Sequence, residues 1–333
     1  MKILVTGNAG FIGFHLCKTL LSINSFKSNT IVGLDNLNNY YDIKLKNDRL
    51  KFLKKISRNK KYFFYKIDLY NYKKIKKIFR KYKFDIVIHL AAQAGVRASV
   101  QKPNIYTNSN LVGTFNLIDV AKEFKIKHFL FASTSSVYGN NNNSDFAEKD
   151  NTDFPIQYYA ATKKSNEVML HCYSKIYSIP VTCMRFFTVY GPWGRPDMSL
   201  NKFISGIIKN KFLPIYNNGK HFRSFTYIDD VIKCILKLIK KPPIIKSKNR
   251  RAPFQILNVG TNVASSLNDY LIEIEKNLGK KAKKNFLPLQ LGDVIKTKAN
   301  NDLLYKKIKF IPKTTIQEGI KKTIEWYINY FKK

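Results

Sequence analysis

Lys2-Ile-Leu-Val-Thr-Gly7-Asn-Ala-Gly10-Phe-Ile-Gly13 is the stretch that decides the fold. Residues 3–6 show no polar alternation, as in parallel strands that are covered on both faces. Three glycines follow at a spacing of three, and apolar residues then recur at helical spacing. A strand, a glycine turn and a helix N-terminus form a pyrophosphate cradle, because the backbone can approach the phosphates and the helix N–H groups face their charge. The stretch therefore predicts a dinucleotide-binding site that includes Gly7, Gly10, Phe11, Ile12 and Gly13.

Length and composition limit the classes of protein to consider. A chain of 333 residues can bury a large core and hold one large domain or two. It has no apolar run long enough to span a membrane, and glycines interrupt the apolar run at its start, so we expect neither a membrane span nor a signal peptide. The four cysteines form no C-x-x-C pair, which predicts free buried thiols in a reducing cytoplasm and no metal site.

The formal net charge of +37 raises the question of nucleic-acid binding. Of the 59 basic residues, 9 are Arg, and the lysines are spread along the whole chain beside many Asn and Ile residues. That mixture is typical of a codon bias towards A and T, so it predicts a solvated lysine-rich surface and no nucleic-acid partner. A second interpretation is a basic surface that attracts a multiply charged small substrate.

An acidic residue follows the second predicted strand, residues 30–34. Asp35 stands about 20 residues past the glycines, where a carboxylate accepts hydrogen bonds from the adenine ribose and repels a 2′-phosphate. No Arg follows directly, so the sequence favours NAD over NADP as the cofactor. Asn36 is included in this site. The alternative interpretation of Asp35 is an aspartate in an ordinary turn after a strand, with no role in cofactor binding.

Strands and helices alternate from residue 2 onward. Further strands are predicted over 62–67, 85–90, 127–132 and 181–186, and helices over 45–56, 71–82 and 103–124. The alternation predicts an α/β fold with a Rossmann-type doubly wound parallel sheet. The residues expected to lie against the cofactor at the carboxyl ends of these strands are Asp68, Leu69, Ala91, Ala92 and Gln93, with Asn110 on the next helix. His89 is expected to pack inside the sheet.

A hydroxyl cluster, Ser133-Thr-Ser-Ser-Val-Tyr-Gly139, follows the fifth strand, where open α/β sheets bind ligands. Tyr159 and Lys163 open the next predicted helix and share one of its faces because they are four residues apart. An ammonium beside a phenol favours the ionised phenol, which suits the pair to acid–base chemistry. Tyr158 lacks such a partner because Thr162 stands at the same spacing.

The alternation loosens near residue 180, and proline, glycine and aromatic residues become more frequent. We therefore predict an NAD-binding Rossmann domain over 1–180 and a smaller mixed α/β substrate domain over 181–333. Segments around 223–240 and 254–262 are candidates to return to the first domain. The last helix, about 315–331, carries an apolar stripe and is expected only to pack.

Over nearly its whole length the chain resembles the extended short-chain dehydrogenase/reductase family of nucleotide-sugar epimerases and dehydratases. Longer stretches make it most similar to the branch that epimerises UDP-glucuronate at C4. These stretches are Asp35-Asn-Leu-Asn-Asn-Tyr-Tyr-Asp42, Ala91-Ala-Gln-Ala-Gly-Val-Arg-Ala-Ser99, Ser109-Asn-Leu-Val-Gly113, Tyr159-Ala-Ala-Thr-Lys-Lys164 and Arg185-Phe-Phe-Thr-Val-Tyr-Gly-Pro-Trp-Gly-Arg-Pro-Asp-Met198.

The resemblance implies three catalytic residues. Tyr159, as a phenolate, would take the proton of the sugar 4-hydroxyl while a hydride leaves C4 for NAD. Lys163 would hold the nicotinamide ribose, and Thr134 would hydrogen-bond the reacting oxygen. The 4-keto sugar would then turn over and take the hydride back on its other face, so NAD would act without net redox change.

The resemblance also implies how the substrate is bound. A 4-keto uronate loses carbon dioxide readily, so its carboxylate must be clamped, and the residues implied are Ser135, Ser136, Thr188 and Arg195. Related dehydratases carry Thr-Asp-Glu at 134–136 and related decarboxylases carry Glu at 136, so neither activity is expected here. The remaining substrate-binding residues implied are Arg97, Tyr216, Asn217, Arg223 and Asp293. Gln290, where many relatives have Arg, weakens the expectation for the uridine.

The family implies a cytoplasmic homodimer that acts on a UDP-sugar, paired through helices near 103–122 and 158–178. UDP-galacturonate for surface polysaccharide would be the product. One alternative is an epimerase of UDP-glucose or UDP-N-acetylglucosamine, which needs no carboxylate clamp. Another is a non-catalytic NAD-binding protein, against which the intact Tyr159 and Lys163 pair argues. A nucleic-acid-binding protein is a further alternative, which would require tight and steeply salt-dependent DNA binding.

Overall fold

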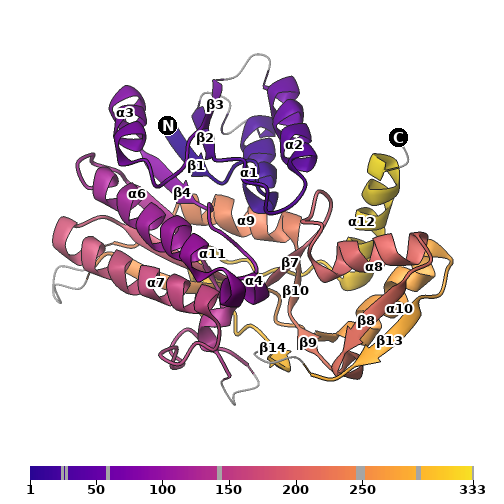
Figure 1. Cartoon of the computed structure of the whole chain (residues 1–333). Helices are drawn as coiled ribbons and strands as arrows, with labels where there is room; N and C mark the ends of the chain where they lie inside the picture. The colour runs from indigo at the N-terminus through magenta and orange to yellow at the C-terminus, as the bar shows by residue number, and fades with distance from the viewer. Residues whose placement is uncertain are drawn as a thin grey trace. The chain divides into compact units, whose positions relative to one another are not determined.

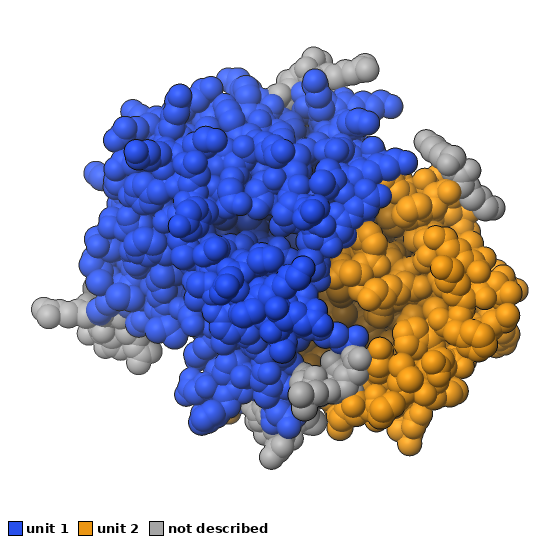
Figure 2. All heavy atoms as spheres, in the orientation of Figure 1, with its two compact units in different colours: residues 1–140, 150–185, 235–257 blue, residues 141–149, 186–234, 258–333 orange. Residues whose placement is uncertain are grey.

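The computed structural model describes residues 1–23, 26, 29–57, 61–140, 145–244, 252–289 and 294–331. Its internal contacts divide the chain into two compact units, coloured separately in Figure 2. Unit 1 comprises Met1–Asn140, Asp150–Arg185 and Ile235–Leu257, and unit 2 comprises Asn141–Lys149, Phe186–Cys234 and Asn258–Lys333. The division into functional domains at residue 180 stays a prediction.

Unit 1 is built on one sheet. Within the described residues its strand order is β11-β6-β5-β4-β1-β2-β3 (Figure 1). The strands are β1 (Lys2–Thr6), β2 (Thr30–Asp35), β3 (Tyr62–Lys66), β4 (Ile86–His89), β5 (His128–Thr134), β6 (Val181–Phe186) and β11 (Phe254–Val259). β1 pairs in parallel with both β2 and β4, so the chain winds away from β1 in both directions. The predicted doubly wound sheet is confirmed.

Helices cover both faces of this sheet. They are α1 (Phe11–Ser22), α2 (Ile43–Ile56), α3 (Tyr72–Tyr82), α4 (Val96–Gln101), α5 (Pro103–Tyr106), α6 (Gly113–Ala121) and α7 (Tyr158–Tyr177), with a π-helical turn η2 (Thr107–Val112) and a 3₁₀ turn η3 (Ser135–Tyr138). Figure 1 shows α3, α6 and α7 on one face and α1 and α2 on the other. The apolar stripe of α3 is buried in a core that also receives residues of α6 and β5.

The helix predicted over 103–124 is broken into three pieces. Pro103 starts a helix of one turn, and the N–H of Gly113 then bonds the carbonyl of Asn108 five residues earlier, which defines the π turn. The helix α4 before it was not predicted. The helix α4 and the π turn η2 both follow β4. The π turn changes which of its side chains face the carboxyl end of that strand, where Asn110 bonds Gln93.

Unit 2 holds short strands and four helices among its described residues. Its elements are β7 (Thr188–Tyr190), α8 (Ser199–Ile208), β8 (Phe212–Tyr216), the 3₁₀ turn η4 (Asn217–Gly219), β9 (Phe222–Arg223), β10 (Phe225–Tyr227), β12 (Ser265–Ser266), α10 (Leu267–Leu278), β13 (Lys283–Leu287), β14 (Lys296–Thr297), α11 (Asp302–Ile308) and α12 (Ile316–Phe331). The remaining helix, α9 (Ile228–Ile239), begins in unit 2 and ends in unit 1. The sequence predicted neither α10 nor α11. The predicted packing stripe of α12 is buried at Ile320 and Ile324, but Phe331 is 53% exposed.

Three of the cysteines are buried, whereas Cys172 on α7 is exposed, which corrects the expectation that all four are buried. No helix in the described part of the chain is both long and apolar enough to cross a bilayer.

Candidate active site

The glycine turn between β1 and α1 is closely packed. Gly7 has a φ of +70°, and a Cβ there would lie 2.8 Å from the Ala91 nitrogen. A Cβ on Gly13 would lie 2.1 Å from the Gly7 carbonyl oxygen. α1 starts at Phe11 with Gly10 as its N-cap, and no side chain caps it. An uncapped helix N-terminus beside a bare backbone turn fits the pyrophosphate of a dinucleotide.

Asp35 ends β2 next to this turn. Its carboxylate accepts hydrogen bonds from the backbone N–H groups of Leu37, at 2.8 Å, and Ala9, at 3.2 Å. Burial raises the pKa of Asp35, while these hydrogen bonds and the charges of Lys46 and Arg49 act in the opposite direction. The carboxylate stands at the end of β2, as the predicted ribose-binding role requires.

Arg49 is a residue that the sequence did not single out. It lies on α2, is fully buried, and donates from Nη1 to the Ala9 carbonyl at 2.8 Å and to the Tyr41 hydroxyl at 2.7 Å. It thereby supports the glycine turn from the side of α2. The available signal was a single Arg in a helix whose other basic residues are all lysines.

Other predicted cofactor residues gather at the same edge of the sheet. Asn36 donates to the Asp68 carboxylate at 2.9 Å, which joins the ends of β2 and β3. Leu69 is buried, and Ala91 and Ala92 are partly exposed after β4. His89 bonds Thr6 on one ring nitrogen and Thr114 on the other, and burial lowers its pKa to about 3. It is therefore a neutral packed residue, as predicted.

Asn110 is fully committed to contacts inside the protein. Its Oδ1 accepts from the Gln93 N–H at 2.8 Å, and its Nδ2 donates to the Gln93 carbonyl and to the Thr162 hydroxyl. The π turn brings it to this position. Asn110 therefore anchors the loop after β4 to α7, and its direct contact with a cofactor stays a prediction.

The hydroxyl cluster lies at the carboxyl end of β5. Thr134 is the last residue of the strand and is 8% exposed. Its Oγ1 donates to the Ser136 hydroxyl at 3.2 Å and accepts from the Ser136 N–H at 3.1 Å. Ser135 and Ser136 are partly exposed in η3. Three hydroxyls thus stand together at the edge where ligands bind such sheets.

Tyr159 and Lys163 lie in the first turns of α7. The Tyr159 N–H donates to the Ser99 hydroxyl at 3.1 Å, and its ring contacts Tyr106 edge-on. Lys163 is 2% exposed, and its Nζ donates to the Ala132 carbonyl at 2.8 Å. The neighbouring Tyr158 instead pairs its hydroxyl with Thr107 at 2.6 Å.

Burial dominates the electrostatics of Lys163. It lowers the pKa of the ammonium from 10.5 to about 7, although Cys183 and Glu167 act to raise it. The ammonium lies 4.7 Å from the centre of the Phe131 ring, a geometry that favours the cation. Unit 1 thus places a lysine with a pKa near neutrality one turn from Tyr159.

In unit 2, Arg195 is held by an aspartate that the sequence did not single out. Its Nε and Nη2 donate to the two carboxylate oxygens of Asp197 at 2.9 and 2.5 Å. The Arg195 carbonyl accepts from Asn201. Thr188 is the partly exposed first residue of β7. The sequence signal for Asp197 was its position two residues after Arg195.

The other predicted substrate residues have varied surroundings. Arg223 donates from Nη1 to the carbonyls of Phe222 and Ile295 within the β12-β9-β14 sheet. Tyr216 and Asn217 are partly exposed at the junction of β8 and η4. Arg97 is exposed on α4 of unit 1. Asp293 and Gln290 lie outside the described residues.

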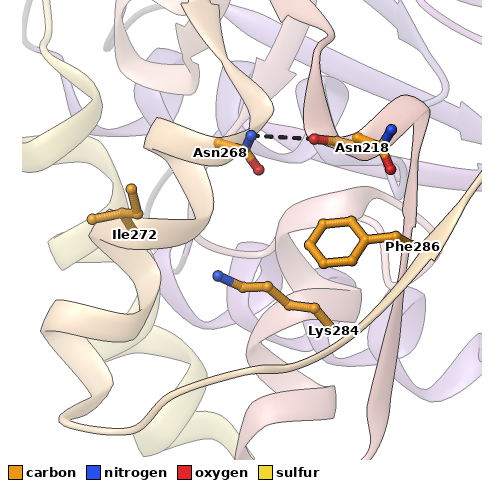
Figure 3. A pocket seen from close by; sticks show the side chains of 5 residues that line it. All are labelled: Asn218, Asn268, Ile272, Lys284 and Phe286. Atoms are coloured by element: carbon orange, nitrogen blue, oxygen red, sulfur yellow. Dashed lines mark hydrogen bonds between the residues drawn. The ribbon is translucent and has the colours of Figure 1, made fainter.

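Unit 2 also contains an open pocket of about 510 Å³ beside η4 (Figure 3). Asn268 donates to the Asn218 carbonyl at 3.3 Å on its rim. Figure 3 shows Ile272 of α10 and Phe286 of β13 on either side and Lys284 below them. None of the three residues predicted to be catalytic lines this pocket.

Comparison with known proteins adds to this geometry. Residues 3–260 match the model of the NAD dependent epimerase/dehydratase family. The chain is 45% identical to Protein CapI of Staphylococcus aureus, over the full length of both proteins. It is 41% identical to the probable UDP-glucuronate 4-epimerase of Rhizobium meliloti, with 98% of this chain and 97% of that protein covered.

A solved structure has the same fold. The UDP-glucuronic acid 4-epimerase of Bacillus cereus, determined with UDP-glucuronic acid and NAD, is 33% identical and has a TM-score of 0.89 over 99% of this chain and 100% of its own. The expected family and the expected fold are therefore confirmed. With its glycine turn, the acid after β2 and the tyrosine–lysine pair on α7, this chain belongs to the NAD-dependent epimerase/dehydratase family.

Proposed function

We propose that this protein is a 4-epimerase that uses NAD to interconvert UDP-glucuronate and UDP-galacturonate. The observation that carries the proposal is the placement of Thr134, Tyr159 and Lys163 of unit 1, with Ser135 and Ser136 where dehydratases would need an acid–base pair. Hydroxyls at these positions can donate hydrogen bonds to an anion, but they cannot drive the loss of water. The relatives named UDP-glucuronate 4-epimerase support the same substrate.

The chain's own residues perform the proton transfers and the binding. Tyr159, as the phenolate, accepts the proton of the sugar 4-hydroxyl and returns it when the 4-keto intermediate is reduced on the opposite face. Thr134 hydrogen-bonds the reacting oxygen, and the Lys163 ammonium stabilises the phenolate. When bound, NAD supplies the acceptor and donor of the hydride at C4, so the reaction has no net redox change. The uncapped start of α1 and the Asp35 carboxylate would hold the cofactor.

Specificity for the uronate would come from donors to its carboxylate. Ser135 and Ser136 offer hydroxyls, and Thr188 and Arg195 of unit 2 are the further donors that the resemblance implies. A clamped carboxylate cannot align its bond with the 4-ketone, so carbon dioxide is retained. UDP-galacturonate made in this way would serve surface polysaccharide synthesis in the cytoplasm.

A second candidate function is the epimerisation of a neutral UDP-hexose. The pairing of Arg195 with Asp197 favours it, because the carboxylate already occupies two donors of the guanidinium. A substrate carboxylate would have to share Arg195 with Asp197 or displace it. UDP-glucose and UDP-N-acetylglucosamine require no such donor.

One experiment separates these functions. Purified protein is incubated with UDP-glucuronate and no added NAD, and the sugar H4 coupling is followed by NMR. Conversion to UDP-galacturonate is the expected result. A pentose with carbon dioxide would mean that the carboxylate is not clamped, and conversion of UDP-glucose or UDP-N-acetylglucosamine alone would favour the second candidate. No turnover of any of the three, with added NAD as a control, would refute both.

We also propose a homodimer that pairs through α6 and α7. Phe115 on α6 and Val168 and Ile176 on α7 are large apolar side chains that are 43%, 58% and 64% exposed. Light scattering after size exclusion should give twice the 38.7 kDa of one chain. A Val168→Glu variant should shift the mass towards the monomer, and a wild-type monomer would contradict the proposal.

A further inference from the structure

A buried polar network lies under the proposed catalytic residues in unit 1. The Glu167 carboxylate on α7 accepts from the Ser133 hydroxyl at 2.5 Å and from Arg185 Nε at 3.0 Å, both at Oε1. Arg185 Nη2 donates to the other oxygen at 2.8 Å. The side chains of Arg185 and Glu167 are 2% and 3% exposed. This ion pair is therefore removed from solvent and holds one geometry.

The network joins the two elements that carry the catalytic groups. Ser133 directly precedes Thr134 on β5, and Glu167 is one turn after Lys163 on α7. The Lys163 ammonium also bonds the Ala132 carbonyl, so the end of β5 is attached to α7 at two successive residues. Because Tyr159 and Thr134 sit on the two joined elements, these bonds fix their separation.

Arg185 extends the network in the other direction. Its guanidinium carbon lies 4.8 Å from the centre of the Tyr138 ring, at the end of η3. η3 contains Ser135 and Ser136, so the turn that follows Thr134 rests on the same ion pair. Arg185 itself is a residue of β6, so the network also includes that strand.

Glu167 also supplies the negative charge that Lys163 faces. Burial has the largest effect on the pKa of Lys163, followed by the titratable groups Cys183 from β6 and Glu167 from α7, and Lys163 in turn acts on His89 of β4. Burial raises the pKa of the Cys183 thiol and keeps His89 neutral. Among the described residues, Glu167 is thus the anion that favours the protonated lysine.

We propose that Glu167 is a positioning residue of this active site: held by Arg185, it sets the place of Thr134 through Ser133, one helical turn from Lys163. The inference rests on the proposed roles of Thr134, Tyr159 and Lys163. A purely structural ion pair would affect only how much protein folds. A positioning residue also changes the turnover of the folded protein.

The first test is Ser133→Ala, which removes one link and leaves the ion pair intact. We expect kcat to fall at least about tenfold with KM and bound NAD unchanged, because small displacements of reacting groups have large effects on rate. Ser174→Ala is the matched control, since Ser174 is a fully buried serine on α7 whose hydroxyl has no partner among the described residues. Its kcat should equal that of the wild type. A wild-type kcat for Ser133→Ala would overturn the positioning role.

The second test is Glu167→Gln, assayed across pH. Loss of the carboxylate lets Lys163 release its proton more easily, so the alkaline limb of kcat should move to lower pH by about one unit. If this variant does not fold, Glu167→Gln/Arg185→Gln leaves no unpaired buried charge, and its kcat should fall with KM unchanged because the link from α7 to Ser133 is weakened. An unchanged limb would overturn the charge role. A wild type inactive on every UDP-sugar would instead refute the proposed function, so the two failures are distinct.

Discussion

Replacing Lys163 with Met should change how the stability of the protein depends on pH. In the folded protein, burial lowers the pKa of Lys163 from 10.5 to about 7. Between these two values the unfolded chain binds a proton that the folded chain does not bind. Raising the pH in this window therefore stabilises the folded state, and lowering it towards 7 removes that stabilisation.

The magnitude follows from the shift. One proton difference changes the free energy of unfolding by about 1.4 kcal/mol per pH unit. Over the roughly 3.5 units between the two pKa values this amounts to about 5 kcal/mol at most. Between pH 7.5 and 9.0 the wild type should gain about 2 kcal/mol relative to Lys163→Met. Below pH 7 both states bind the proton, and the difference should be constant.

Urea unfolding of the nucleotide-free proteins measures this difference. Both tryptophans, Trp193 and Trp326, belong to unit 2, so unfolding of unit 1 is better followed by hydrogen exchange of α7 amides. The control is Lys164→Met, because Lys164 is partly exposed and bonds Thr152 and Asp153 near the surface. It should show no comparable slope. Parallel pH curves for the wild type and Lys163→Met would refute the reasoning.

Three further changes test other parts of the site. Tyr159→Phe should lower kcat by about 10²–10⁴ while bound NAD, measured on the denatured protein, stays constant; substantial remaining turnover would contradict its acid–base role. Gly13→Ala should lower both the melting temperature and the NAD content, because its Cβ would lie 2.1 Å from the Gly7 carbonyl oxygen, and a variant with normal NAD content would show that the turn adapts. Arg185→Met should destabilise the protein by about 3–5 kcal/mol in denaturant titrations, since it leaves the Glu167 carboxylate buried without its cation, and adding Glu167→Leu should recover much of that loss.

Much of the fold could be predicted because its signals are local. The glycines of the first turn follow one strand and open one helix, and β6 agrees with its predicted range residue for residue. Tyr159 and Lys163 are four residues apart, so any helix over this segment places both side chains on one face. The position of Asp35 could be predicted from the end of the second strand alone. Each of these inferences depends on a few neighbouring residues.

The residues that were missed depend on neighbours distant in the sequence. Arg49 reaches the glycine turn 40 positions away. Asn110 was predicted at the site, but its bond to Gln93 arises through a π turn that no spacing rule predicts. Glu167 meets Ser133 across 34 positions. A helical pattern shows that such side chains face inward but not which polar group they meet. Buried polar partners therefore had to come from the structure.

The groups packed around Lys163 explain why its pKa lies near 7. Glu167 is paired with Arg185 but still acts to raise the pKa of Lys163, while burial keeps His89 and Cys183 uncharged. The Lys163 ammonium bonds a backbone carbonyl and no carboxylate among the described residues, so burial is the larger effect and lowers its pKa. A negative charge that develops beside it, on a phenolate or a sugar oxygen, offsets that cost without any reorganisation of the protein. The same desolvation that lowers the stability of the resting fold thus strengthens the interaction on which the proposed proton transfer depends.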